Sequence, residues 1–86
     1  MDINKLIAIV KNKLKKEFIV ENIIIEDKSF LHKNHKGNQK GKFHLKIFIK
    51  SEQLKKLNKL DSNKKIFKIL KEEIKKNIHS LQLFID

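Results

Sequence analysis

Apolar residues recur at two different spacings along the chain, and the spacing predicts which segments are helices and which are strands. Between Asp2 and Phe18 they return every three or four residues, which predicts an amphipathic helix; they are Ile3, Leu6, Ile7, Val10, Leu14 and Phe18. Asp2 or Asn4 is placed to cap this helix through a side-chain oxygen. The lysines of the segment fall mainly on its other face, so we expect its apolar side to cover a core.

Three shorter segments have the pattern of strands. Residues 21–27 contain a run of three isoleucines, and residues 43–50 and 78–85 alternate between apolar and polar positions. In the second segment the apolar face is made by Phe43, Leu45, Ile47 and Ile49. We expect the first two strands to pair antiparallel, with one face of the sheet buried.

Two helices are predicted between the second and third strands. Ser51 begins a short helical turn, and Asp61 is predicted to cap a longer helix. Their apolar residues are Leu54 and Leu57 in the first, and Ile66, Phe67, Ile69, Leu70 and Ile74 in the second. A helical crossover of this length makes the strands at 43–50 and 78–85 parallel. The sequence therefore predicts an α+β fold with the order α-β-β-α-α-β.

Eighty-six residues allow one small domain, which we expect to span 1–86. Residues 28–42 are polar and contain both glycines, Gly37 and Gly41, so we expect a flexible loop in the hairpin between the first two strands.

The chain has four histidines, and the predicted topology brings them toward one end of the sheet. His44 and His79 begin the two parallel strands, and His32 and His35 lie in the loop that enters the same end. His79 shares the alternation of the apolar face, where a histidine is more often part of the core than a ligand. His44 is expected on the opposite face. The four residues are candidate metal ligands, and a polar cluster without a dedicated metal is the alternative.

The charge of the chain is strongly positive and comes from lysine alone. The formal net charge is +11, with no arginine, and Lys, Ile and Asn make up half of all residues. Because these three residue types share A/T-rich codons, coding bias is one explanation of the charge, and polyanion binding is the other. Without arginine the chain lacks the planar fork that most often recognises guanine.

Several classes of protein are disfavoured by the sequence. Cysteine is absent, which excludes disulfides and thiolate metal sites within this chain, and no apolar run is long enough for a membrane span. The segment from Gly37 to Gly41 lacks the Walker pattern, and no serine lies in a nucleophile motif. We therefore expect a non-enzymatic protein of the bacterial cytoplasm that does not bind membranes.

Short motifs distributed over nearly the whole chain resemble the BolA family. The loop carries a Ser-x-x-His-x-x-His pattern at Ser29, His32 and His35, and a strand opens with His44-Leu45. Near the end, Ile78-His79-Ser80-Leu81 is similar to the family's Val-His-Ala-Leu signature. The resemblance implies a three-stranded mixed sheet covered by helices on one face, similar to the type II KH topology. A glycine-rich clamp between the helices is missing at 57–61, which counts against RNA binding of the KH kind.

The same resemblance implies a partner and a cofactor. Members of the family pair with a monothiol glutaredoxin and share a [2Fe-2S] cluster with it, so the chain is expected to be a monomer alone and a heterodimer with this partner. Carried over by position, the implied ligands of this chain are His79 and one loop residue, His35; His44 and His32 are the alternatives. Other members are linked to DNA binding and transcriptional regulation. Here the family's Arg-His-Arg segment is replaced by Ser62-Asn63-Lys64, so we expect DNA binding to be nonspecific and salt-sensitive.

Overall fold

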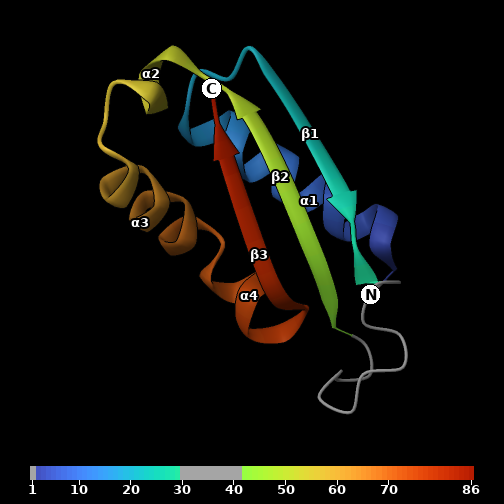
Figure 1. Cartoon of the computed structure of the whole chain (residues 1–86). Helices are drawn as coiled ribbons and strands as arrows, with labels where there is room; N and C mark the ends of the chain where they lie inside the picture. Colours follow the sequence, from blue (N-terminus) through green and yellow to red (C-terminus); the bar gives the residue numbers. More distant parts are fainter. Residues whose placement is uncertain (1, 30–41) are drawn as a thin grey trace.

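The structure is a computed structural model that describes residues 2–29 and 42–86. The elements follow one another as α1 (Ile3–Glu17), β1 (Asn22–Asp27), β2 (Phe43–Lys50), α2 (Glu52–Lys55), α3 (Lys59–Ile69), α4 (Lys71–Lys76) and β3 (Ile78–Ile85) (Figure 1). This order agrees with the predicted one, apart from a division of the long helix into α3 and α4.

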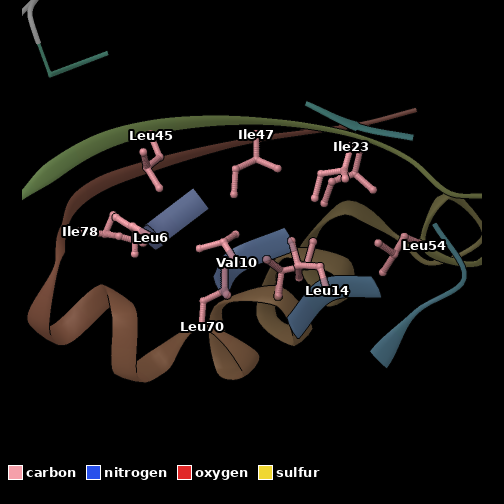
Figure 2. Packing of buried hydrophobic residues seen from close by; sticks show 11 residues of the cluster. Leu6, Val10, Leu14, Ile23, Leu45, Ile47, Leu54, Leu70 and Ile78 are labelled. Atoms are coloured by element: carbon pink, nitrogen blue, oxygen red, sulfur yellow. The ribbon is translucent and has the colours of Figure 1, made fainter. Parts of the chain in front are cut away.

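The three strands form one mixed sheet in the order β1-β2-β3. Strand β2 is central; β1 pairs with it antiparallel and β3 pairs with it parallel, as the sequence predicts. The helices pack on a single face of the sheet, where the buried side chains of sheet and helices meet (Figure 2). The predicted α+β class, with helices covering one face of a mixed sheet, is confirmed.

Helix α1 begins at its predicted cap. Asp2 Oδ1 accepts hydrogen bonds from the backbone N–H groups of Asn4 and Lys5, at 2.6 and 3.3 Å. Between the two candidates for the cap, Asp2 is therefore the capping residue and Asn4 is a donor to it. The buried face of the helix carries Leu6, Val10 and Leu14.

The cap of α3 differs from the prediction. Asn58, not Asp61, is the capping residue, and its Oδ1 accepts from the backbone N–H of Asp61 at 2.8 Å. The Asp61 carboxylate in turn accepts from the side-chain amide Nδ2 of Asn58 at 3.1 Å, so the side chain of the cap is held by the residue whose N–H donates to it. An aspartate in the first turn is favourable there because of the helix dipole, which explains why it resembled a cap in the sequence.

The helical segment changes direction at Leu70, where the sequence predicts a continuous helix. Leu70 has φ −95° and ψ 13°, outside the helical range, and its side chain is fully buried. Figure 1 shows α3 and α4 running in different directions from this point.

One apolar core lies between the helices and the sheet (Figure 2). Its buried members are Leu6, Val10, Leu14, Ile23, Leu45, Ile47, Ile49, Leu54, Ile66, Leu70 and Ile78. Ser51 is also fully buried, and its hydroxyl donates to the carbonyl of Ile19 at 2.7 Å and accepts from the N–H of Leu54 at 3.2 Å. The buried hydroxyl is therefore satisfied, and Ser51 caps α2 as predicted.

Candidate functional site

Two of the four histidines lie side by side at one end of the sheet. His44 is the second residue of β2 and His79 is the second residue of β3. Their ring centroids are 4.7 Å apart, with an angle of 63° between the ring planes, so the contact is edge to face. The parallel pairing of β2 with β3 places both residues at this end, as the sequence predicts.

A β-bulge in β3 determines which way the side chain of His79 faces. Phe43 lies opposite Ile78 while His44 lies opposite Ser80, so His79 is the extra residue of β3. The bulge interrupts the alternation of the strand, and both Ile78 and Leu81 turn toward the core. As a result His79 is exposed, and the expectation that it shares the apolar face is wrong.

His44 is buried, although its place before Leu45 in β2 puts it on the face opposite the core, as predicted. Its exposed fraction is 4%, and its Nδ1 lies 2.6 Å from the hydroxyl oxygen of Ser80. Its backbone N–H donates to the Ser29 hydroxyl at 3.1 Å, and its backbone carbonyl accepts from the N–H of Lys28 at 2.7 Å. The ring and the backbone of His44 are therefore both held in place by neighbouring segments.

The chain leaving β1 is fixed against this site. The N–H of Ser29 donates to the carboxylate of Asp27 at 2.9 Å, which forms a tight turn directly after the strand. This turn brings the Ser29 hydroxyl to His44. The beginning of the predicted loop therefore lies at the histidine end of the sheet, as expected.

The other two candidate ligands, His32 and His35, lie outside the described residues. Within 2–29 and 42–86, no group of three or more His, Cys, Asp or Glu side chains is arranged to hold a metal ion. The described site consists of the pair His44 and His79 with two serines around it. Sequence reasoning did not single out Ser29 and Ser80 for these contacts; Ser80 meets His44 only because the bulge shifts the register by one residue.

Comparison with known proteins assigns the chain to a family. The sequence pattern of the family described as "BolA-like protein" matches residues 14–85, which is most of the chain. The chain belongs to the BolA family. Proteins of this family are regulators or adaptors and not enzymes, in agreement with the expectation from the sequence.

A curated relative and two solved structures extend this assignment. The chain is 32% identical over 77 residues to the DNA-binding transcriptional regulator BolA of Haemophilus influenzae, covering 90% of this chain and 72% of the relative. Its fold is similar to BolA1 from Arabidopsis thaliana, with a TM-score of 0.78 and 26% identity, and to the BolA domain of SufE1 from the same plant, with 0.76 and 24%. Each comparison covers 92% of this chain and 87% of the other.

In the described part of this BolA-family chain, no helix combines the length and the hydropathy needed to cross a membrane.

Proposed function

We propose that this BolA-family chain is an adaptor that docks on a monothiol glutaredoxin and contributes histidine ligation to a shared [2Fe-2S] cluster, in iron–sulfur trafficking or iron sensing. The observation that carries the proposal is the exposed ring of His79, held outward by a bulge and supported on one side by His44. The chain is a monomer alone and a heterodimer with this partner.

The residues present fit such a shared cluster better than a metal site of the chain's own. A [2Fe-2S] cluster needs four ligands, and imidazole replaces thiolate on one iron in Rieske centres. The described part of the chain offers one exposed imidazole and no cysteine, so thiolates have to come from a partner. When bound, the cluster supplies iron and sulfide for transfer or redox sensing.

His44 is a positioning residue in this proposal. Because its Nδ1 is engaged with Ser80 and its ring is buried, it supports the orientation of His79 from behind. Outer contacts of this kind orient a metal-binding ring. The second ligand of the chain is His35, with His32 as the alternative, as the family resemblance implies.

The test is the visible circular dichroism spectrum of the complex with cluster-loaded monothiol glutaredoxin. The wild-type chain is expected to change the spectrum of the glutaredoxin cluster, since the imidazoles of His79 and His35 replace two of its thiolate ligands. With His79→Ala, the mixture is expected to keep the spectrum of the cluster that glutaredoxin binds alone. His35→Ala is expected to do the same, or to do so partially if another histidine replaces it.

Gln82→Ala is the matched control, because Gln82 is exposed on the same strand but lies away from the histidine end. It should behave as wild type. An unchanged spectrum for His79→Ala would overturn the ligand assignment. If the wild-type chain neither binds the glutaredoxin nor alters its cluster, the adaptor function itself is wrong.

A second candidate, a DNA-binding regulator, is favoured by the name of the Haemophilus relative and by the net charge of +11. Specific regulation requires binding to one duplex that persists at physiological salt. If about six lysines neutralise phosphates, a plot of the logarithm of the association constant against the logarithm of the salt concentration has a slope of about −5. The affinity then falls steeply between about 50 and 200 mM salt. Equal affinity for unrelated duplexes would identify nonspecific binding and reject the regulator.

A further inference from the structure

The face of the sheet opposite the helices carries an apolar row that crosses all three strands. Ile24 of β1 lies opposite Phe48 of β2, and Phe48 lies opposite Phe84 of β3. Ile24 is 51% exposed and Phe84 is 47% exposed. In Figure 1 the strands lie in front of α1, so the view is onto this face, which no helix of the described chain covers. This row is not part of the core.

The two phenylalanines form a stacked pair beneath a lysine. Their ring centroids are 5.1 Å apart with an angle of 19° between the planes. The Lys46 ammonium lies 5.0 Å from the Phe84 centroid and 5.3 Å from the Phe48 centroid. The face thus combines aromatic rings with a cation in direct contact with them.

Phe84 lies between two surface hollows. One, of about 250 Å³, is lined by residues that include Ile24, Phe48 and Lys50 in addition to Phe84. The other, of about 310 Å³, lies between β3 and the helices α2 and α3, and its lining includes Phe84, Lys55, Lys59 and Asn63. A flat ring placed in either hollow would contact the Phe84 side chain.

The charges around these hollows are mostly positive. Lys46, Lys50, Lys55 and Lys59 contribute four cations. Asp86 opposes them in the first hollow, but its carboxylate lies 3.9 Å from Lys55. Glu26, opposite Lys46 on β1, is paired with Lys28 at 3.4 Å. The excess of lysine favours an extended anionic ligand.

We propose that this face binds single-stranded nucleic acid, with bases against Phe84 and Phe48 and phosphates at the surrounding lysines. Aromatic side chains on a sheet surface, bordered by cations, are the usual platform for unpaired bases. A duplex keeps its bases stacked internally, so it can use the lysines but not the phenylalanines. The preference for single strands is therefore what separates this site from general attraction to polyanions.

Phe84→Trp gives a direct test, because the chain contains no other tryptophan. Oligo-dT and oligo-U strands of about 12 nucleotides are titrated into this variant at low salt, with a duplex of equal length beside them. Single strands are expected to quench the tryptophan fluorescence in a saturable manner, since bases stack on the ring. The duplex is expected to leave the fluorescence nearly unchanged. The DNA and RNA strands together show whether the sugar matters.

Matched variants separate stacking from charge in the wild-type background, measured by fluorescence anisotropy of labelled strands. Phe84→Leu is expected to weaken single-strand binding at least about fivefold. Phe67→Leu is the control, because Phe67 is similarly exposed, at 40%, but lies on α3 outside both hollows. Lys50→Gln with Lys55→Gln should weaken binding more than Lys15→Gln with Lys16→Gln, which removes the same charge at the end of α1.

Three outcomes would overturn the proposal. Equal affinity for single strands and duplex would mean that only charge is used. Equal losses in the Phe84 and Phe67 variants would mean that the ring at position 84 makes no special contact. Binding of the Phe84→Trp variant to vesicles of anionic phospholipid, with no fluorescence response to either single strand, would identify the face as a membrane contact.

Discussion

Lys13 and Glu73 are joined in a bidentate ion pair across 60 residues of sequence. The Lys13 ammonium donates to both carboxylate oxygens of Glu73, at 2.8 and 2.9 Å. The Glu73 side chain is 10% exposed, and the Lys13 side chain is 38% exposed. The pair fastens α4 to α1, two helices on the same face of the sheet, and it compensates the burial of a carboxylate.

Replacing Lys13 is therefore expected to destabilise the protein. Lys13→Met leaves the nearly buried Glu73 carboxylate without its partner and should lower the free energy of unfolding by about 1–2 kcal/mol. Urea unfolding followed by far-UV circular dichroism measures the change. Lys76→Met is the control, because its pair with Glu72 is exposed on both sides and should contribute less than about 0.5 kcal/mol. Equal losses of stability in the two variants would mean that the partly buried Lys13–Glu73 pair contributes no more than the exposed Lys76–Glu72 pair.

The elements that hydrophobic spacing could predict were those with a regular period. Helix α1 keeps one period, and in β2 the residues Leu45, Ile47 and Ile49 alternate, so one buried face follows from the sequence. The burial of His44 on the other face of β2 does not follow from it. The break at Leu70 could not be predicted in this way, because apolar residues at helical spacing recur before it, at Ile66 and Ile69, and after it, at Ile74. The Lys13–Glu73 ion pair could not be predicted from the sequence either, since it depends on the orientation of α4 after that break.

The cap of α3 can be tested by two substitutions. Asn58→Ala removes the acceptor of the Asp61 N–H and should cost about 1 kcal/mol of stability. Asp61→Ala removes only the reciprocal contact and a favourable charge in the first turn, so it should cost about 0.5 kcal/mol. Thermal and urea unfolding of both variants measure the difference. A larger cost for Asp61→Ala would restore Asp61 as the effective cap.

The Ser80 hydroxyl is expected to stabilise the buried His44 ring. Ser80→Ala removes the partner of Nδ1 and should lower stability by about 1–2 kcal/mol, since a buried polar atom loses its hydrogen bond. Ser80→Thr keeps the hydroxyl and is the control. If Ser80→Ala unfolds at the same urea concentration as wild type, His44 does not depend on this contact.

The histidine site was only partly predictable, and the reason is local. Parallel pairing predicts that His44 and His79 share one end of the sheet, and they do. Strict alternation also predicts which way each ring faces, and for His79 this was wrong because one extra residue shifts the strand. The pattern Ile78-His79-Ser80-Leu81 carries one sign of the bulge, because Ile78 and Leu81 are three residues apart and would face opposite sides of a regular strand. Both reach the core only because an extra residue lies between them.

From the bulge we predict how substitutions at positions 78 and 79 change stability, and this distinguishes a loss of ligation from a loss of the fold. Because His79 is the exposed extra residue, His79→Ala should change the free energy of unfolding by less than about 0.5 kcal/mol. Its neighbour Ile78 is 2% exposed in the core, so Ile78→Ala should cost about 2–4 kcal/mol. Urea unfolding of the two variants distinguishes the bulge from a regular strand, in which His79 would be a core residue and its removal would be costly. If His79→Ala is as stable as wild type, any loss of its effect on a glutaredoxin-bound cluster reports the missing imidazole and not a damaged fold.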